Sequence, residues 1–346
     1  MHLGGEMVRE KVNNLKHRVF KSLIVIGIAF ASIIIMILIF KIGTLIYYHD
    51  FYNKAKCEFE IPELLDDFVP QGFEYRTEDN VFLISGYMNK DSTARIYIVE
   101  PDGSYKKVEI QNIESDALLS HAGGICSLGG YIYIAGCDGK CYVLTAESVM
   151  DSKSGDAMII GSFETYNNAD FCCSNGDSLY VGEYYYPIKY KTDTKHDFIS
   201  PAGDENNAII TSFNMNNDMQ LGVNESPVSA YSIRSTVQGM CFTDNNEIAL
   251  SVSSIFKGSQ LYCYDLDSIS RGEIGSLFID EVSIPVYYVD SSTIEQKIEV
   301  LPKSEGLAFC NGRVYILFES ASNRFRYGKL IKGNYVFSYD LKSAEN

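Results

Sequence analysis

The chain has 346 residues, of which 46% are hydrophobic, and its formal net charge at pH 7 is −16. This length permits either two domains or one large β domain. An acidic surface repels a phosphate backbone, which argues against nucleic-acid binding. The same charge suits a solvated surface or a cleft that attracts cations.

The N-terminal part of the chain predicts a membrane anchor. Residues 1–21 form a basic tail, and an uncharged apolar run over 22–40 follows between Lys21 and Lys41. A run of about 20 such residues crosses the hydrocarbon core as a helix, and no polar face interrupts this one. A cleaved signal peptide would have a shorter apolar region followed by a small-x-small cleavage site. We therefore expect one uncleaved transmembrane helix.

The distribution of charge around this run predicts its orientation. Basic residues are concentrated before it, so the positive-inside bias places the N-terminus in the cytoplasm and the C-terminal part outside. Residues 41–56 are expected to form a juxtamembrane stalk, with Tyr47, Tyr48, Phe51 and Tyr52 as an aromatic belt at the membrane exit. The predicted location is thus the cell membrane, with a single-pass anchor and an extracytoplasmic domain over 57–346.

Beyond residue 65 one pattern recurs five times, at intervals of roughly 50 to 70 residues. A polar or small residue precedes a short apolar stretch, a Gly/Asn/Asp turn follows, and a second apolar strand comes next. The copies begin at Gln71-Gly72-Phe73, Gly123-Gly124-Ile125, Asp170-Phe171-Cys172, Gln238-Gly239-Met240 and Glu305-Gly306-Leu307. A repeat of this kind, made only of strands, predicts the blades of a β-propeller. The predicted fold class is all-β, a five-bladed β-propeller preceded by one transmembrane helix.

The ends of the repeat array predict how the ring closes. The last repeat has three predicted strands before the chain ends, which leaves its outer position open. The alternating segment 57–62 is expected to supply that strand and to remove the open edge. The long span 267–304 contains two apolar runs, 278–288 and 298–301. A six-bladed propeller with a degenerate blade in this span is the alternative.

Polar residues precede the five first strands and end the second strands, and in a propeller both positions open on one face. Two long loops, 185–206 and 320–332, border that face, where function concentrates. The predicted ligand-binding residues at this axial mouth are Gln71, Tyr87, His121, Asp170, Glu183, Tyr184, Gln238, Glu305 and Glu319. At this mouth, Tyr87 and Tyr184 could stack on a sugar or an aromatic ligand. The simpler alternative is that the polar residues only hydrate the channel.

The oxygen-rich set at the mouth permits two kinds of chemistry. Carboxylate and amide oxygens could hold Ca²⁺, with Glu305 and Asp170 as the candidate ligands. In a hydrolase that uses this metal, His121 or Glu183 would move protons. Two carboxylates could also form an acid/base pair if burial separates their pKa values. Motifs for serine hydrolases, zinc proteases, nucleotide-binding proteins and EF-hands are missing from the sequence. The catalytic residues, if there are any, stay undefined.

Most of the nine cysteines lie in predicted strands, where they are expected to be small apolar filler. Cys137 and Cys141 differ because they bracket a tight Asp-Gly turn. Their side chains could face each other across a hairpin and form a disulfide. No second Cys/His pair with matching spacing accompanies them, so a zinc site is not expected.

With these motifs in view, the repeats resemble the lactonase and strictosidine-synthase-like propellers. The chain looks still closer to uncharacterised bacterial membrane-anchored β-propeller proteins. The segments that carry the resemblance are Val69-Pro-Gln-Gly72, His121-Ala-Gly-Gly124, Gln238-Gly239 and Ser304-Glu-Gly306. In the lactonase-like enzymes a first-strand Glu-Gly-Pro supplies a calcium-binding glutamate. The resemblance implies that role for Glu305, although Leu307 replaces the proline.

The preferred hypothesis is a surface-anchored binding module whose axial site takes a small-molecule, glycan or protein ligand. One alternative is a Ca-dependent, lactonase-like hydrolase. Another is a structural interaction protein of the cell envelope that uses blade edges.

Overall fold

A computed structural model describes residues 3–90, 93–111, 119–151, 155–254, 258–270, 273–279 and 281–342 of the chain. The extreme ends of the predicted tail and of the predicted β domain, residues 1–2 and 343–346, lie outside the described residues. The chain forms two compact units, Met1–His49 and Asp50–Asn346.

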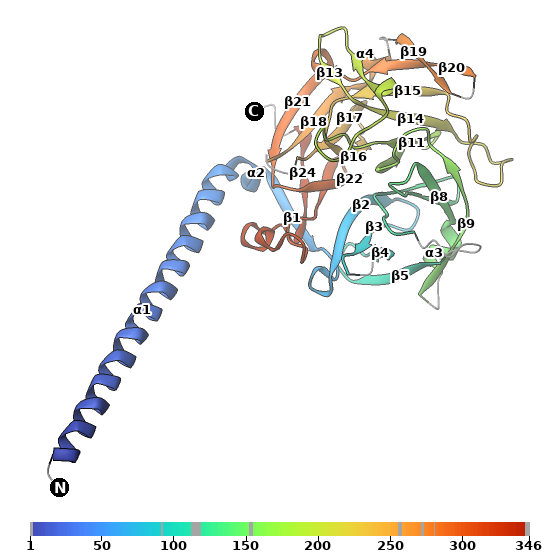
Figure 1. Cartoon of the computed structure of the whole chain (residues 1–346). Coiled ribbons are helices and arrows are strands. Elements are labelled where there is room, and N and C mark those ends of the chain that lie inside the picture. Colours follow the sequence, from blue (N-terminus) through green and yellow to red (C-terminus); the bar gives the residue numbers. More distant parts are fainter. Residues whose placement is uncertain are drawn as a thin grey trace. The chain divides into compact units, whose positions relative to one another are not determined.

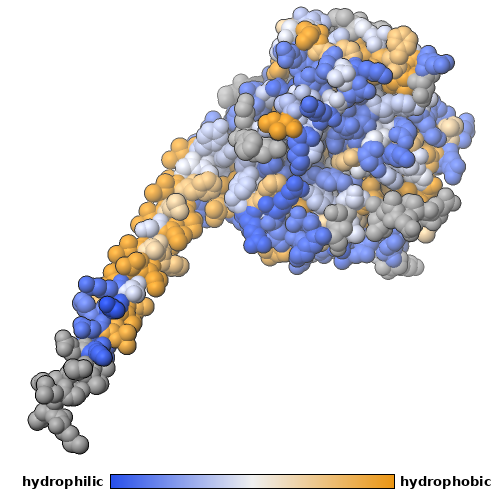
Figure 2. Space-filling view, viewed as in Figure 1, coloured by the Kyte–Doolittle hydropathy of each residue, from blue (hydrophilic) through white to orange (hydrophobic). Residues whose placement is uncertain are grey.

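The first unit is a single helix, α1 (Leu3–Tyr47). Its segment Asn13–Tyr47 is long and apolar enough to cross a membrane, and no other helix in the described residues is. Figure 2 shows apolar side chains over most of the visible side of this helix. A signal sequence near the N-terminus has the same properties. The helix could therefore be a signal anchor or a membrane span.

The second unit is built from antiparallel strands joined in sequence order (Figure 1). Its first two groups are β2 (Phe68–Arg76), β3 (Val81–Met88), β4 (Ala94–Val99) and β5 (Tyr105–Gln111), then β6 (Gly124–Leu128), β7 (Tyr131–Ala135), β8 (Lys140–Thr145) and β9 (Asp156–Glu164). The third is β10 (Phe171–Ser174), β11 (Ser178–Gly182), β14 (Ala208–Asn214) and β15 (Ser229–Ile233). The fourth is β16 (Val237–Phe242), β17 (Glu247–Val252), β18 (Ser259–Asp265) and β21 (Ile294–Val300), and the last is β22 (Ser304–Cys310), β23 (Arg313–Phe318), β24 (Tyr335–Tyr339) and β1 (Ala55–Glu60).

Shorter elements connect or extend these groups. The helices are α2 (His49–Lys54), α3 (Ala146–Met150) and α4 (Leu266–Ser270), with 3-10 turns η1 (Leu64–Asp66), η2 (Thr194–His196), η3 (Ser291–Thr293) and η4 (Arg326–Ile331). The remaining strands are the β12 (Phe198–Ile199)–β13 (Glu205–Asn206) pair and the β19 (Glu273–Ile279)–β20 (Val282–Tyr288) hairpin.

The first strands of the groups gather around one axis. Contacts join β2 to β6, β6 to β10, β10 to β16, β16 to β22, and β22 back to β2. A closed ring of first strands, each leading an antiparallel meander, is the arrangement of a β-propeller. Figure 1 accordingly shows β2, β16 and β22 toward the middle of the domain and β19 and β20 at its periphery.

The predicted closure strand is confirmed. β1 pairs antiparallel with β24, and Cys57 lies opposite Phe337. The early strand thus completes the last group and protects the edge of β24.

The span 267–304 divides between two existing sheets. β20 pairs in parallel with β15, with Ala230 opposite Val286, and β19 extends that sheet further. β21 pairs with β18, as the fourth strand of its own group. The described residues of this span therefore form no separate four-stranded sheet. A second parallel contact, between β5 and β9, joins the first two groups at their outer edges.

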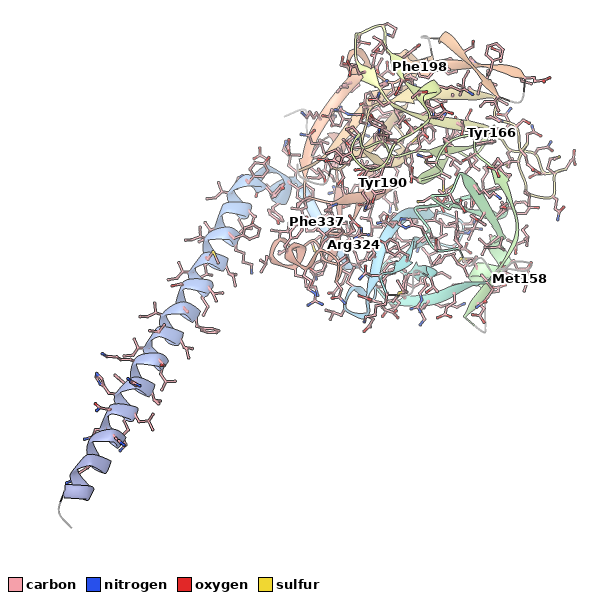
Figure 3. The ribbon with its side chains drawn as sticks, in the orientation of Figure 1. Met158, Tyr166, Tyr190, Phe198, Arg324 and Phe337 are labelled. Atoms are coloured by element: carbon pink, nitrogen blue, oxygen red, sulfur yellow. The ribbon has the colours of Figure 1, made fainter. Side chains whose placement is uncertain are left out.

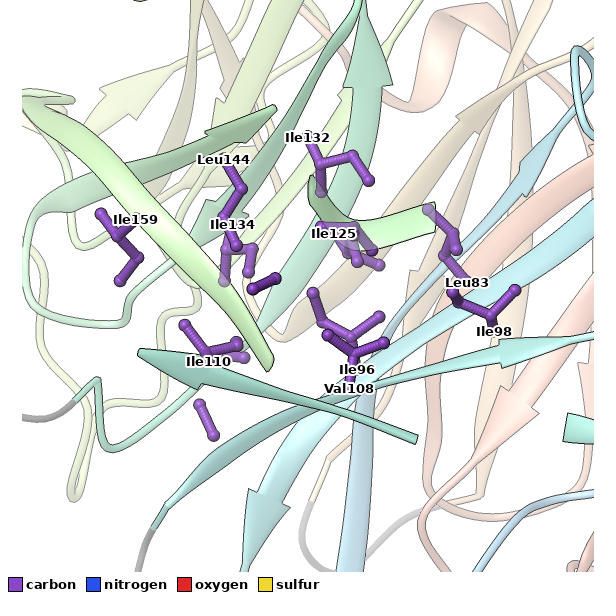
Figure 4. Close-up of a cluster of buried hydrophobic side chains, with 14 of the residues drawn as sticks. Leu83, Ile96, Ile98, Val108, Ile110, Ile125, Ile132, Ile134, Leu144 and Ile159 are labelled. Atoms are coloured by element: carbon purple, nitrogen blue, oxygen red, sulfur yellow. The ribbon is translucent and has the colours of Figure 1, made fainter. Parts of the chain in front are cut away.

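The hydrophobic core lies between neighbouring groups. One cluster fills the space between β2–β5 and β6–β9, where Ile96, Ile132 and Ile134 are fully buried (Figure 4). Strand alternation sends every second side chain to such an interface, because successive side chains point to opposite faces. Full burial of each such side chain contributes about 1.5–3 kcal/mol.

The predicted aromatic belt is wrong for Phe51. This side chain is only 2% exposed, and its ring centroid lies 5.3 Å from that of Phe337 and 6.4 Å from that of Tyr339. The neighbouring Tyr52 donates its hydroxyl to the Ile331 carbonyl oxygen at 2.7 Å. Phe51 therefore anchors α2 in the β domain, because its ring completes an aromatic cluster. The predicted stalk is accordingly helical over much of its length.

The repeated glycines mark the narrowest part of the ring. A Cβ atom on Gly306 would lie 2.5 Å from the Phe73 backbone nitrogen, and one on Gly239 would lie 2.7 Å from the Glu305 carbonyl oxygen. Neighbouring first strands approach so closely here that only a residue without a side chain fits. The glycines thus separate two ends of the axis, each of which contains a cavity.

Candidate functional site

A cavity of about 580 Å³ opens at the axial end where the first strands begin. Eight of the nine predicted site residues line it, namely Gln71, Tyr87, His121, Asp170, Tyr184, Gln238, Glu305 and Glu319. They come together because first strands begin, and second strands end, on the same side of the propeller. The volume is within the range of small-molecule sites.

Glu183, the ninth predicted residue, does not line the cavity. Its side chain is fully buried, and Oε1 lies 2.7 Å from Nδ1 of His196 and accepts a hydrogen bond from the Ile209 backbone N–H. Oε2 accepts from the Asn168 backbone N–H at 3.2 Å. The prediction was wrong because consecutive residues point to opposite sides of an extended chain. Tyr184 faces the axis, and Glu183 instead holds the long loop that contains His196.

Several lining residues were not predicted from the sequence. Lys189 and Tyr190 come from the loop after β11, and Arg324 and Phe325 come from the loop after β23 (Figure 3, which labels Tyr190 and Arg324). Lys303 directly precedes β22. Its backbone has a φ of 63°, so the alternation of an extended strand does not predict where its side chain points. The loop residues carry no periodic signal either.

Two buried carboxyl groups form the floor of the cavity. Glu305 is 2% exposed and Glu319 is 6% exposed. Burial, together with the charge of Glu319, raises the pKa of Glu305 well above its ordinary value. A hydrogen bond also joins the two carboxyl groups.

Neighbouring side chains fix this carboxyl pair. The Gln238 amide donates to Oε1 of Glu305 at 3.2 Å, and the Gln71 amide donates to Oε2 of Glu319 at 3.3 Å. Lys303 Nζ lies 3.3 Å from Oε1 of Glu319. Burial raises the pKa of Glu319, whereas the charge of Lys303 opposes that rise. The floor thus combines the Lys303–Glu319 ion pair with a second carboxyl group that accepts a hydrogen bond from an amide.

His121 lies on the wall of the cavity beside Tyr87. The two ring centroids are 4.4 Å apart, and His121 Nε2 is 3.1 Å from Oε1 of Gln71. Burial, and next the charge of Arg324, lowers the pKa of His121 to about 4. At neutral pH the imidazole is therefore uncharged, and Nε2–H donates to the Gln71 oxygen.

Asp170 and Tyr184 line the cavity from the neighbouring group of strands, that of β10 and β11. Oδ2 of Asp170 accepts a hydrogen bond from the Tyr184 backbone N–H at 2.7 Å, and burial raises the pKa of Asp170 to about 6. The Tyr184 ring meets that of Tyr190 edge-on, with 5.6 Å between centroids. This wall offers one acidic oxygen and two aromatic rings.

The donor set does not fit the calcium site that the resemblance implies. Lys303 pairs with Glu319, and the Gln238 amide donates to Oε1 of Glu305. Hard cations need several ionised or carbonyl oxygens directed at one point. Within the described ranges, no group of three or more His, Cys, Asp or Glu side chains could hold a metal ion.

The predicted Cys137–Cys141 disulfide is wrong, since all nine thiols are free. Cys141 is fully buried and lies opposite Ala135 in the β7–β8 pair. Cys137 lies in the turn with a φ of 58° and lines the axial cavity. The hairpin therefore places the two side chains in different environments.

A second cavity, of about 300 Å³, lies at the other end of the same first strands. Its lining includes Glu74, Cys126, Cys173 and Cys241. Oε1 of Glu74 accepts from the Ser127 backbone N–H at 2.7 Å, whereas the buried Oε2 has no hydrogen-bond partner among the described residues. Burial raises the pKa of Glu74 to about 7.

No protein-family model matches the sequence, and no curated protein sequence matches it. Among solved structures, a gluconolactonase from Xanthomonas campestris aligns at 8% identity over 76% of this chain and 79% of its own, with a TM-score of 0.38. A glutaminyl cyclase from Myxococcus xanthus aligns at 11% identity over 76% and 90%, with a TM-score of 0.39. The WD40 propeller domain of Doa1 aligns at 11% identity over 78% of each chain, with a TM-score of 0.36. Similarity this low supports no functional argument.

Proposed function

We propose that the protein is a membrane-anchored binding module, in which a five-bladed propeller holds a small polar ligand in its axial cavity. The observation that carries the proposal is the convergence of eight predicted polar and aromatic side chains on one cavity of about 580 Å³. Two long loops add charged and aromatic side chains at its mouth. The blade count rests on the cyclic contacts of β2, β6, β10, β16 and β22.

The proposed topology places residues 1–21 in the cytoplasm, 22–40 in the membrane and the propeller outside. Its support is the apolar α1 segment and the concentration of basic residues before it. Protease added to intact cells should digest the β domain. Protection until the cells are lysed would contradict this topology.

The binding proposal is tested by a ligand screen on the full-length protein in detergent. Thermal unfolding would be followed by circular dichroism against monosaccharides, sugar acids, amino acids and hydroxy acids. A ligand that binds only the native state raises stability by mass action, by about 2.7 kcal/mol at a hundredfold excess over Kd. We expect at least one compound to raise the Tm of the wild type.

Matched variants locate the binding. Gln238→Ala removes an amide from the axial cavity and should abolish the shift. Gln260→Ala changes an amide that bonds Glu299 outside that cavity and should keep it. A screen without any shift, or equal shifts for both variants, would refute the axial site.

A hydrolase that works in the same cavity is the second candidate. The observation that favours it is the buried Glu305–Glu319 pair: burial raises the pKa of both carboxyl groups, and Lys303 opposes the rise at Glu319. Such a pair can act as general acid and general base. Turnover in a panel of lactones and esters that is lost in Glu305→Gln would support the hydrolase, and no turnover by the wild type would remove it.

A further inference from the structure

Three cations, Lys189, Lys303 and Arg324, line the axial cavity, although the net charge of the whole chain is −16. Lys303 pairs with Glu319 at 3.3 Å. Lys189 and Arg324 then remain as cations in the lining, with Asp170 and the buried Glu305 as the other acidic groups. An acidic protein that concentrates cations at one opening attracts anions there.

The two cations contact aromatic rings and a hydroxyl group. Arg324 donates to the hydroxyl of Tyr87, and its guanidinium carbon lies 5.3 Å from the centroid of the Phe325 ring. Lys189 Nζ lies 4.8 Å from the centroid of the Tyr190 ring. Among the described residues, neither cation forms an ion pair with a carboxylate. Their charges are therefore available to a ligand, since a ring face and a neutral hydroxyl leave donors unused.

The deeper lining suits hydroxyl groups. Gln71 and Gln238 supply amide groups, and Asp170 supplies an acceptor. Tyr184 and Tyr190 present aromatic surface on one wall. Amides and carboxyl groups around an aromatic wall match a compact molecule that has several hydroxyl groups and an apolar ring face.

Resting on the proposed function, we propose that the axial cavity binds a sugar acid, with the carboxylate of the ligand on Arg324 and its hydroxyl groups toward Gln71, Gln238 and Asp170. The planar guanidinium matches a carboxylate with two parallel hydrogen bonds. Lys189 adds a second positive charge at the mouth.

The test is calorimetric titration of the full-length protein in detergent with D-glucuronate, D-galacturonate and D-gluconate. D-Glucose is the neutral comparison, and D-glucose 6-phosphate separates a carboxylate from a phosphate. We expect at least one sugar acid to bind about tenfold or more tightly than glucose, since a hydrogen bond to a charged group contributes enough for that ratio.

Two variants in one loop make the result specific. Arg324→Met should reduce sugar-acid affinity by about tenfold while glucose binding stays unchanged. Arg326→Met removes an exposed arginine of the same loop that does not line the cavity, and it should have no effect.

The inference would be overturned if glucose bound as tightly as every acid, if Arg324→Met kept full affinity, or if the phosphate were preferred. Failure of all three acids to bind would also overturn it. The broader screen decides separately whether the cavity binds any polar ligand. The inference and the proposed function can therefore fail independently.

Discussion

The two ends of the propeller axis use the same five first strands and differ in chemistry. The end where the strands begin holds carboxyl groups, amides and cations, and two long loops border it. The other end holds thiols and the carboxyl group of Glu74, and it lies beside strand-connecting turns. In the third group, Asp170 lies on one side of the close approach between first strands, and Cys172 lies on the other side. The proposed binding site is therefore at the end with long loops, whereas the other end is lined by buried thiols.

The largest expected effect concerns the glycine ring that separates the two ends. Gly306→Ala would place a methyl group 2.5 Å from the Phe73 nitrogen and 2.8 Å from the Gln71 carbonyl oxygen. Both neighbours are backbone, so the first strands would have to move apart. We expect a loss of about 3 kcal/mol in the free energy of unfolding, measured by denaturant titration.

Gly312→Ala is the control for that substitution. It lies in the turn that follows the same strand, at a φ of +73°, with nothing within 4 Å of an added Cβ. Its cost should be about 1 kcal/mol, from backbone conformation alone. Equal losses for the two variants would show that close packing at the axis does not limit stability.

Sequence patterns predicted the part of this architecture that follows local rules. The strands, the closure by β1 and the convergence of Gln71, Gln238 and Glu305 follow from alternation and from the repeated glycine. Glu183 does not reach the cavity because side chains continue to alternate beyond the end of β11, and it is Tyr184 that faces the axis. Arg324 could not be predicted, since irregular loops give no periodic signal for the direction of a side chain.

The long-range features were also beyond the sequence. The parallel contacts of β5 with β9, and of β15 with β20, join strands whose pairing depends on how blades pack. Phe51 follows the apolar run closely, as a membrane-interface aromatic residue would, but its ring packs in the aromatic cluster of the β domain. A tertiary contact decided each of these cases.

The next largest effect is the pH dependence of stability that Glu74 causes at the thiol-rich end, the end of the axis lined by Cys126, Cys173 and Cys241. The pKa of Glu74 is raised to about 7 in the folded protein from an ordinary value of 4.5. The native state therefore holds this proton more tightly, and its contribution to stability is complete below pH 4.5 and is lost as pH rises to about 7. We expect the wild type to lose about 1–3 kcal/mol over that window on this account.

Glu74→Gln removes the titrating group and keeps an oxygen for the Ser127 bonds. Chemical unfolding between pH 4.5 and 8 should show a smaller decline for this variant than for the wild type. Asp170→Asn, at the opposite end of the axis, should remove only the part of the stability decline that is centred near pH 6. If the free energy of unfolding fell with pH as steeply in Glu74→Gln as in the wild type, the Glu74 carboxyl group would be ionised and solvated in the native protein.

The smallest expected effect is that of reductant. All nine thiols are free, and burial raises the pKa of Cys137 and Cys141 well above the ordinary value, which disfavours the reactive thiolate. Dithiothreitol should leave the Tm unchanged, and thiol titration in denaturant without reductant should count nine groups. A count of seven thiols, together with a lower Tm after reduction, would instead support a disulfide between Cys137 and Cys141.

The most direct test of the axial site is hydrogen–deuterium exchange of the full-length protein with and without the tightest compound from the screen. Binding at the proposed site should slow exchange in the loops 185–206 and 320–332, which supply Tyr190 and Arg324 to the cavity. Segments 126–128, 172–174 and 240–242, at the thiol-rich end, should exchange as before. Protection confined to those three segments, or to the β19–β20 hairpin at the periphery, would contradict the axial site.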